Sequence, residues 1–505
     1  MKSDYILFKS INSNNYFYSF NNNQILLIHP IIYFFLNLNK DGININDWIK
    51  KNLKNKFEIE NIGTFSKKEI LYYHRKFIFL LNNNYFKNKY INNTFRYNKE
   101  DIKYYLSNTS QISFEATDRC NLACEYCIYG KYYTNRNKSQ NINLNIDTAK
   151  KVLNYLVELW NSSLNSSHKK KISVGFYGGE ALLNFNFIYK IVNFVKTLNS
   201  KHCNFSFNMT TNGVLLDKYI PFLVENNFDI IISIDGGLES NNIYRKFPNQ
   251  KPAFKTIYKN ILAIRNKYPE YFDKHISFNS VLHNKNSFAE IYNFFLSNFN
   301  KTPLTSEIDT DSINQDLAKE FYEMYESAYD SLHKEKDFNF IEKEHYVGSV
   351  ENLRKFIFAY SGYVKLSYLD LISDDKNDPK LPTGTCEPFS RKIFVNARGQ
   401  ILPCERIGHQ FVLGYANKNN ISLDFDKIAK KYNEYFDNIN NQCNNCFFIK
   451  SCNICMFKEN IESKDLQCKG FMNYSSLAEY LSQNMSYLEQ NPETYLNVLN
   501  KINVI

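Results

Sequence analysis

A chain of 505 residues and 59.7 kDa is longer than one hydrophobic core usually organises, so we expect two to four domains. Hydrophobic residues make up 44% and aromatic residues 16% of the chain, which excludes an intrinsically disordered protein. The net charge of +10 comes from scattered Lys and Arg rather than from basic blocks, so we expect no nucleic-acid partner and no polybasic membrane anchor.

The first 100 residues have the pattern of a small α+β module. Strand-like runs at Tyr5–Phe8 and Tyr16–Phe20 precede two predicted helices. The first helix begins at Pro30, because proline is favoured in the first helical turn. The second begins with the capping box that Ser66 and Glu69 form. No cluster of catalytic residue types occurs in this module.

The apolar runs of this module indicate a cytoplasmic protein. The longest, Ile25–Leu38, contains polar residues and a proline and is too short to cross about 30 Å of hydrocarbon. The N-terminus lacks the apolar region of a secretory signal. We therefore predict a cytoplasmic location and no transmembrane helix.

Residues 105–300 alternate between short apolar strands and helical segments. The stretches between the strands, such as 147–160 and 187–198, are long enough for crossover helices. This pattern favours a parallel βα barrel or an open parallel sheet, in which ligands gather at the C-terminal strand ends. The predicted strands are Ile112–Ala116, Ile172–Tyr177, Phe205–Met209, Ile230–Ile234 and Ile276–Leu282.

The C-terminal third of the chain is predicted to have three parts. Residues 301–380 have a mainly helical pattern and form a bridge. Residues 381–475 are rich in Gly, Pro and Cys with few periodic segments, which is typical of a small metal-binding domain. Residues 476–505 form a helical tail.

Eleven cysteines in a cytoplasmic chain favour metal ligands over disulfides, because reducing compartments keep thiols free. Ten of them occur in clustered spacings, and only Cys203 stands alone, as expected of a core thiol. Cys120, Cys124 and Cys127 form a Cys-x3-Cys-x2-Cys loop directly after a predicted strand. A zinc site would favour paired Cys-x2-Cys knuckles with four ligands. Three thiolates instead suit a four-iron cluster with one open iron.

The sequence around these cysteines, CNLACEYC, resembles the signature of the radical S-adenosylmethionine (SAM) superfamily. The resemblance implies a partial (β/α)6 barrel similar to a TIM barrel, so that the whole chain is an α/β protein with an N-terminal α+β module and a C-terminal Cys-rich iron–sulfur domain. It also implies that a [4Fe-4S] cluster on Cys120, Cys124 and Cys127 binds SAM and cleaves it to a 5′-deoxyadenosyl radical.

Motifs at the later strand ends agree with this resemblance. FYGGE ends the second strand, TNG the third and ISIDGG the fourth, and an arginine follows twelve residues after the serine. Each motif alone is a common turn in α/β proteins, so their order carries the inference. The family often has His-Asp-x-x-Arg where this chain has Asn241 and Asn242. The resemblance implies cofactor contacts by Tyr126, Gly178, Gly179, Glu180, Asn212, Ser233, Asp235 and Arg245.

Seven further cysteines lie in the 381–475 segment. Their two Cys-x2-Cys pairs alone would suit a zinc ribbon. The complete array resembles the SPASM domain, which carries two auxiliary [4Fe-4S] clusters, although its last pair has two intervening residues where the family usually has three. Two such clusters need about eight thiolates, so one iron is expected to stay open or to take another ligand. The resemblance implies an inner cluster on Cys386, Cys404 and Cys455 and an outer cluster on Cys443, Cys446, Cys452 and Cys468.

Glu405 is the residue that we expect to act in catalysis besides the clusters. It follows Cys404, at a position where the resembling sulfatase maturases carry an aspartate beside a cluster cysteine. A base here could take the proton released when a substrate radical is oxidised. The alternative is a solvated glutamate in a turn.

These patterns together predict a radical SAM/SPASM oxidoreductase that modifies or cross-links side chains of a ribosomally made precursor peptide. Its expected cofactors are SAM and three [4Fe-4S] clusters, and its expected partners are the precursor and an electron donor such as flavodoxin or ferredoxin. The N-terminal module would bind the leader peptide by adding it to a sheet edge. The alternatives are an anaerobic sulfatase maturase that forms formylglycine, a non-enzymatic zinc scaffold, and an RNA-modifying enzyme, which the diffuse charge supports least.

Overall fold

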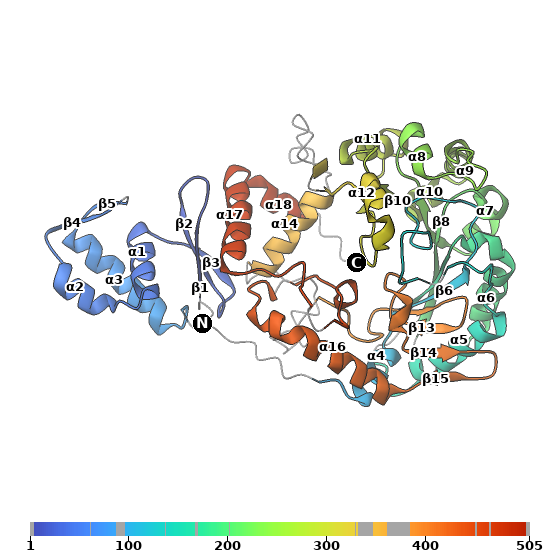
Figure 1. The fold of residues 1–505 in the computed structure, drawn as a ribbon, viewed down its shortest axis with the longest axis horizontal. Coiled ribbons are helices and arrows are strands. Elements are labelled where there is room, and N and C mark those ends of the chain that lie inside the picture. The colour runs from blue at the N-terminus through green and yellow to red at the C-terminus, as the bar shows by residue number, and fades with distance from the viewer. Residues whose placement is uncertain are drawn as a thin grey trace.

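The computed structural model describes most of the chain as a barrel-like α/β body with a smaller N-terminal module (Figure 1). In the part of the chain that it describes, no helix is both long and apolar enough to cross a membrane. The described residues are 5–60, 62–86, 96–136, 138–166, 170–200, 203–328, 330–331, 347–360, 384–449, 452–463 and 466–500.

The N-terminal module is built around a three-stranded antiparallel sheet in the order β1-β2-β3. The predicted strands and both predicted helix starts are confirmed, because Pro30 opens α1 and Ser66 and Glu69 form the capping box of α3. The elements are β1 (Tyr5–Lys9), β2 (Asn15–Ser19), β3 (Gln24–Leu27), α1 (Pro30–Lys40), α2 (Ile45–Asn52), β4 (Lys56–Ile59), β5 (Gly63–Ser66) and α3 (Lys67–Asn82).

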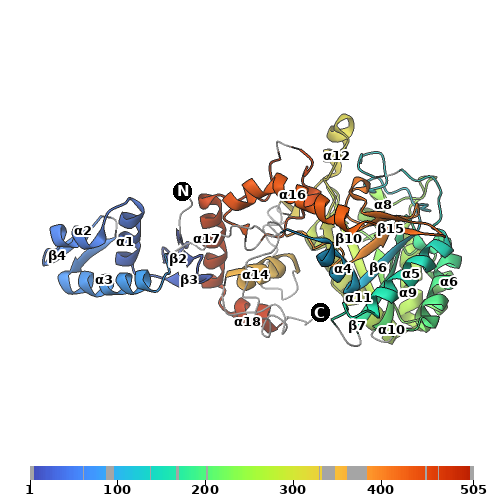
Figure 2. The same ribbon diagram turned by 90° about the horizontal axis from the view of Figure 1, so that it is seen from below.

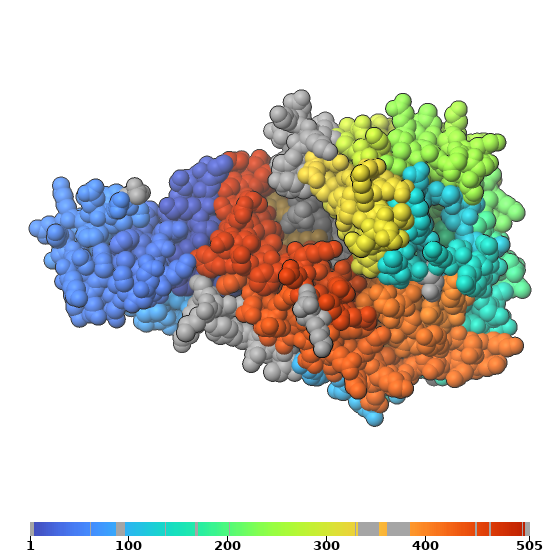
Figure 3. All heavy atoms as spheres, in the orientation of Figure 1, coloured from blue at the N-terminus to red at the C-terminus, as the bar shows by residue number. Residues whose placement is uncertain are grey.

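The N-terminal sheet buries apolar side chains on both faces. Tyr5, Leu7 and Phe17 pack on one face against α1 and α3. Ile6 and Phe8 pack on the other face against three C-terminal helices, and in Figure 3 the blue module lies against the red C-terminal segment. The module is therefore joined to the C-terminal part of the chain by a hydrophobic core. These helices are α14 (Val347–Tyr360), α17 (Tyr474–Gln490) and α18 (Glu493–Asn500).

The central sheet has ten strands in the order β11-β10-β9-β8-β7-β6-β12-β13-β14-β15. Its first six strands in that order are parallel, which confirms the predicted partial (β/α)6 barrel. The five predicted strands are observed, and the sixth was missed because it has only four residues. The strands are β6 (Gln111–Thr117), β7 (Lys170–Gly178), β8 (Cys203–Thr211), β9 (Phe228–Ser233), β10 (Ile276–Leu282) and β11 (Leu304–Glu307).

Amphipathic helices cover the outer side of the parallel strands (Figure 2). Asn145 caps α5 through hydrogen bonds from the amides of Asp147 and Thr148, and the apolar face of α5 is buried against the sheet. The lone Cys203 is buried in this core, as expected. The helices are α4 (Lys99–Ser107), α5 (Ile146–Trp160), α6 (Phe185–Thr197), α7 (Leu216–Glu225), α8 (Leu238–Tyr244), α9 (Phe254–Lys267), α10 (Pro269–His275) and α11 (Phe288–Phe299).

The Cys-rich segment contributes strands to the same sheet, which the sequence did not predict. β12 pairs in parallel with β6, and antiparallel hairpins then continue the sheet. Each of these strands has three residues, too few to show a periodic pattern. Much of the expected 301–380 bridge lies outside the described residues. The elements here are α12 (Ala318–Met324), β12 (Ile393–Val395), β13 (Gln400–Leu402), β14 (Gly414–Ala416), β15 (Ile421–Leu423) and α16 (Phe425–Asn445).

Candidate functional site

The three-cysteine loop follows β6 at the C-terminal end of the parallel strands. The segment after α8 holds its backbone, because the amide of Ala123 donates to the carbonyl of Lys246 at 2.7 Å. The amide of Glu125 likewise donates to the carbonyl of Tyr244 at 3.1 Å. These two hydrogen bonds hold the loop against the end of α8 and the residues that follow it.

The thiols of Cys120, Cys124 and Cys127 lie close enough for their charges to interact. Burial, and to a smaller extent the neighbouring thiols, raise the pKa of Cys120 to about 11 and that of Cys124 to about 12. Across the described ranges, no three His, Cys, Asp or Glu side chains converge tightly enough to enclose a single metal ion. A four-iron cluster binds each thiolate through a different iron, so its ligands stand farther apart.

Two glycines bring the end of β7 against the start of this loop. Gly178 has a φ of +132°, and a Cβ there would lie 2.1 Å from the carbonyl oxygen of Thr117. A Cβ on Gly179 would lie 2.3 Å from the carbonyl oxygen of Arg119. The close approach allows the Gly179 and Glu180 amides to donate to these two carbonyls at 3.0 and 2.8 Å. Only glycine permits this pairing of β7 with the cysteine loop.

The carboxylate of Glu180 is buried and fully engaged by the protein. It accepts hydrogen bonds from the Leu182 amide at 3.0 Å, the Thr211 hydroxyl at 2.8 Å and the Asn212 amide at 2.7 Å. Burial raises the pKa of Glu180, and the three donors oppose that rise. The side chain therefore ties the end of β7 to the end of β8. Its predicted contact with the cofactor stays a prediction.

Two side-chain donors approach the cysteine sulfurs, one from the end of β8 and one from the end of α8. The Asn212 amide lies 3.7 Å from the Sγ of Cys120 and donates to Asn121 at 2.7 Å. The Arg245 guanidinium lies 3.8 Å from the Sγ of Cys124. Both residues were predicted from their motifs, and both lie beside the three-cysteine loop.

Arg245 is held in place by a buried ion pair with Asp235. Its Nε donates to the carboxylate at 2.9 Å, and its guanidinium lies over the Tyr126 ring at 5.6 Å. Asp235 is fully buried and also accepts from the Tyr126 hydroxyl and, at 3.0 Å, from the Val281 amide. The structure thus brings Tyr126, Asp235 and Arg245 together behind Cys124.

The departure from the family motif has a structural role in this chain. Asn241 is fully buried, and its side-chain oxygen accepts a hydrogen bond from the Asp235 amide at 3.1 Å. Asn242 accepts from the Phe254 amide at 3.1 Å and fixes the start of α9. Ser233, the remaining predicted cofactor residue, ends β9 beside Asn279 of β10.

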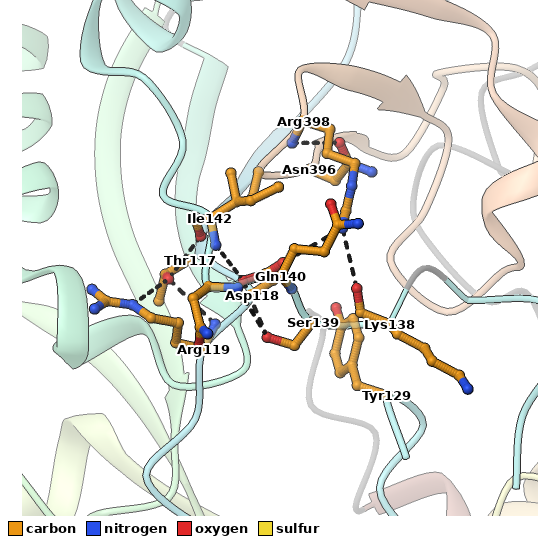
Figure 4. A network of polar contacts seen from close by, with 12 residues as sticks. Thr117, Asp118, Arg119, Tyr129, Lys138, Ser139, Gln140, Ile142, Asn396 and Arg398 are labelled. Carbon is orange, nitrogen blue, oxygen red and sulfur yellow. Dashed lines mark hydrogen bonds and ion pairs between the residues drawn. The ribbon is translucent and has the colours of Figure 1, made fainter. Parts of the chain in front are cut away.

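Asp118 organises the loop around the cysteines, and sequence reasoning missed it (Figure 4). Its buried carboxylate accepts from the amides of Gln140 at 2.9 Å and Ile142 at 2.7 Å and from the Ser139 hydroxyl at 3.3 Å. It also pairs at 3.6 Å with Arg398, which lies at the turn between β12 and β13. No motif marks Asp118, since its partners lie as far as 280 residues away.

Arg136 is a second missed residue, and it lies between the two cysteine-rich regions. It is only 8% exposed, and its guanidinium donates to the carbonyl oxygen of Glu405 at 2.6 Å. Its positive charge acts to lower the pKa values of Cys127, Tyr177 and Asp311, against the larger effect of burial. None of the ion pairs found between described residues involves Arg136. Arg136 is an isolated arginine in the sequence, so no motif marks it. Only the charged groups around it in the fold single it out.

Charge interactions link six of the seven C-terminal cysteines into two sets. The charges of the Cys386, Cys404 and Cys455 thiols all reach the Tyr432 hydroxyl, so these thiols lie in one region. The charges of Cys446, Cys452 and Cys468 interact with one another, and Cys443 lies on α16, one helical turn before Cys446. The ligand sets that the SPASM resemblance implies, and the clusters themselves, stay predictions.

Glu405 lies beside Cys404, but a cation holds it. Both carboxylate oxygens accept from the Lys392 ammonium at 2.9 Å, and the Cys404 Sγ lies 3.6 Å away. Burial alone would raise the pKa of Glu405, but Lys392 outweighs burial and lowers it. The side chain is 11% exposed, so it is not the solvated turn residue of the alternative prediction. A base role would require release from Lys392.

Comparison with known proteins identifies a domain. Residues 114–295 match the model described as the radical SAM superfamily. The chain therefore contains a radical SAM domain and is an enzyme. Two of its relatives are also named as enzymes.

Three relatives and one solved structure illustrate the similarity. The cysteine-type anaerobic sulfatase-maturating enzyme of Clostridium novyi is 26% identical over 69% of this chain and 87% of its own. The radical SAM cyclopropyl synthase TigE of Paramaledivibacter caminithermalis is 25% identical over 68% of this chain and 66% of its own. An uncharacterised Methanocaldococcus jannaschii protein is 39% identical over 28% of this chain, and the chain spans 43% of its length. Native anSMEcpe with bound AdoMet and Cp18Cys peptide is 19% identical, with a TM-score of 0.49 over 77% of this chain and 99% of that one.

The residues of the radical SAM domain fit the cofactors that the family implies, SAM and a four-iron cluster. The cluster loop presents three thiols whose raised pKa values a bound metal would lower, because a cation favours the thiolate. Arg245 and Asn212 place donors beside two of these sulfurs, where hydrogen bonds would stabilise the thiolates. The strand ends around the loop are where a parallel barrel binds its ligand.

Proposed function

We propose that this radical SAM enzyme has a SPASM domain and modifies or cross-links a ribosomally made precursor peptide. One observation supports the proposal: Cys386, Cys404 and Cys455 lie near one buried hydroxyl, and Cys446, Cys452 and Cys468 lie near one another, as two auxiliary iron–sulfur clusters would require. A zinc ribbon would instead need one group of four.

The residues between the first cysteine loop and the inner group would line the reaction space. Bound SAM supplies, on reduction, a 5′-deoxyadenosyl radical that abstracts hydrogen. Arg136 spans from the side of Cys127 to Glu405, so it lies between the radical site and the inner group. The tyrosines Tyr133 and Tyr177 have raised pKa values because they are buried, so they stay protonated and help to exclude water.

The N-terminal module would bind the leader peptide along β3. Side chains of α17 cover the outer edge of β1, because Tyr474 accepts from the Leu7 amide at 3.0 Å and Ser482 donates to the Lys9 carbonyl at 2.6 Å. Among the described residues, β3 pairs on one side only, and its Leu27 side chain is 65% exposed. An extended peptide could therefore add to this edge.

The module is joined to the outer cysteine group, which would guide a bound peptide toward the barrel. The Phe20 ring lies 5.7 Å from the ring of Phe447, which directly follows Cys446. Phe448 packs in the same apolar cluster as β1 and β2. A peptide held on the module would thus start beside the auxiliary domain.

Anaerobic incubation with the peptide encoded beside this gene, followed by mass spectrometry, tests the proposal. We expect a loss of hydrogens in the core peptide together with 5′-deoxyadenosine. The protein should hold on the order of twelve irons. Stoichiometric zinc with about four irons would contradict the two auxiliary clusters.

A second candidate is a sulfatase maturase, which the similarity to the clostridial sulfatase-maturating enzyme over 87% of its length favours. Oxidation of a Cys or Ser in a sulfatase-derived peptide, with no reaction on the peptide encoded beside this gene, would favour the sulfatase maturase. Both candidates need an electron donor, for which we propose flavodoxin or ferredoxin. A cytoplasmic location is supported by the described cysteines, all of which are free thiols.

A further inference from the structure

Tyr432 lies on α16 and presents a buried hydroxyl without a protein partner. Its side chain is fully buried, and among the described residues no group hydrogen-bonds its oxygen. A buried polar group left unpaired costs about 1–3 kcal/mol. Such groups are rare in native proteins, so this hydroxyl requires a partner.

The inner cysteine group lies in the neighbourhood of this hydroxyl. Burial, followed by the charges of Cys455, Cys386 and Cys404, raises the pKa of Tyr432 well above its usual value. The Tyr432 ring packs edge-on at 5.6 Å against Phe457, two residues after Cys455. Cluster sulfurs carry no hydrogen, so the phenol can interact with them only as a hydrogen-bond donor.

The inner group has three cysteines, so one iron of a four-iron cluster would have no cysteine ligand, whereas the proposed contact of Tyr432 is with a sulfur. Hydrogen bonds to cluster sulfurs stabilise the reduced, more negative state and so raise the reduction potential.

We propose that the Tyr432 hydroxyl donates a hydrogen bond to a sulfur of the inner auxiliary cluster and raises the reduction potential of that cluster. The inference rests on the auxiliary clusters of the proposed function and adds a residue that positions and tunes one of them. Tyr432 and Cys443 share the buried face of α16, eleven residues or about 16 Å apart. One helix would thus tune the inner cluster and ligate the outer one.

The experiment uses the full chain with Cys120, Cys124 and Cys127 replaced by Ala, so that only the auxiliary clusters give a signal. Tyr432→Phe removes the hydroxyl and keeps the ring. Tyr435→Phe is the matched control, because its hydroxyl lies on the same helix and faces Glu462 at 3.5 Å. Iron and zinc contents are measured first, and midpoint potentials follow from redox titrations monitored by electron paramagnetic resonance.

We expect Tyr432→Phe to keep its iron and to shift one midpoint to a more negative value, while Tyr435→Phe leaves both midpoints in place. The parent should also show an exchangeable proton coupled to a reduced cluster, and Tyr432→Phe should lose it. An unchanged midpoint, an equal shift in the control, or a loss of about four irons, which would mark a ligand, overturns the inference. Zinc without auxiliary clusters in the unsubstituted protein would overturn the proposed function instead.

Discussion

At the scale of single residues, buried carboxylates hold the radical SAM site together. Glu115, Asp118, Glu180 and Asp235 are each at most 3% exposed, and each accepts at least one backbone amide. A buried carboxylate is stable only when donors surround it. These four residues therefore determine where the strand ends and the cysteine loop meet, before any cofactor binds.

Asp235→Asn should disrupt the site through its effect on Arg245. The substitution leaves a buried guanidinium unpaired beside Cys124, which costs roughly 3–5 kcal/mol. We expect a lower free energy of unfolding and weaker SAM binding, measured by anaerobic denaturation and by equilibrium dialysis. The control is Asp229→Asn on β9, the strand that precedes Asp235, and its partner His275 is partly exposed. Equal effects of the two substitutions would contradict a role for Asp235 at the site.

Glu405→Gln tests the predicted catalytic base. If Glu405 takes a proton, the variant should retain all iron and form 5′-deoxyadenosine, yet give at least about a hundredfold less product. Lys392→Gln is the companion variant, because it frees the carboxylate that Lys392 now holds. A base role predicts that Lys392→Gln keeps product formation. Product at the parent rate in Glu405→Gln would exclude the base role. Loss of iron in both variants would mean that the ion pair of Glu405 with Lys392 instead holds the Cys404 loop in place.

At the scale of elements, the turn between β12 and β13 connects the C-terminal strands to the radical SAM loop. The Ala397 amide donates to Glu115 at 2.7 Å, and Arg398 pairs with Asp118. Both carboxylates flank the start of the cysteine loop. A hairpin from the Cys-rich segment thus buttresses a loop more than 250 residues earlier.

A double-mutant cycle should detect this connection. Asp118→Asn and Arg398→Gln should show a coupling energy of roughly 1 kcal/mol, since the carboxylate is 1% and the arginine 21% exposed. Both variants should also bind SAM more weakly. The exposed pair Asp424 and Lys427 serves as the control, with an expected coupling of about 0–0.5 kcal/mol. Additive effects at Asp118 and Arg398 would show that the hairpin does not support the loop.

Leu27→Pro should block peptide addition to β3 without unfolding the module. The Ile28 amide donates to Asn15 of β2, so the alternation of a strand turns the Leu27 amide outward. Proline is tolerated where an edge amide faces away from the sheet. We expect loss of leader-peptide binding in fluorescence anisotropy, whereas the control Leu27→Ala keeps the amide and binds. Normal binding by Leu27→Pro would exclude this edge.

At the scale of the whole molecule, the N-terminal module is structurally coupled to the C-terminal helices. Ile6, Phe8 and Tyr18 share an apolar core with Phe356 of α14 and Leu481 of α17. The module contains no cysteine, so no cluster ligand lies in it. Its removal would therefore uncover apolar surface without removing any cluster ligand.

Deletion of residues 1–95 should separate these two roles. We expect the truncated enzyme to keep its iron and to cleave SAM without coupling to peptide, because the cysteine loop and its supports remain. Its helices α14 and α17 should become sensitive to limited proteolysis, since the sheet that covers them is gone. A truncated chain as protease-resistant as the parent would contradict the shared core, and normal leader binding would assign that role elsewhere.

The sequence by itself determined the features that depend on local pattern. The five strands from β6 to β10, the capping box at Ser66 and the order of motifs at the strand ends all follow from neighbouring residues. The tertiary structure alone decided the strands β12–β15, which are too short for a periodic signal, and the partners of Asp118, Arg136 and Glu405. Those contacts join residues far apart in the chain, so their energies depend on packing and burial that no local sequence pattern encodes.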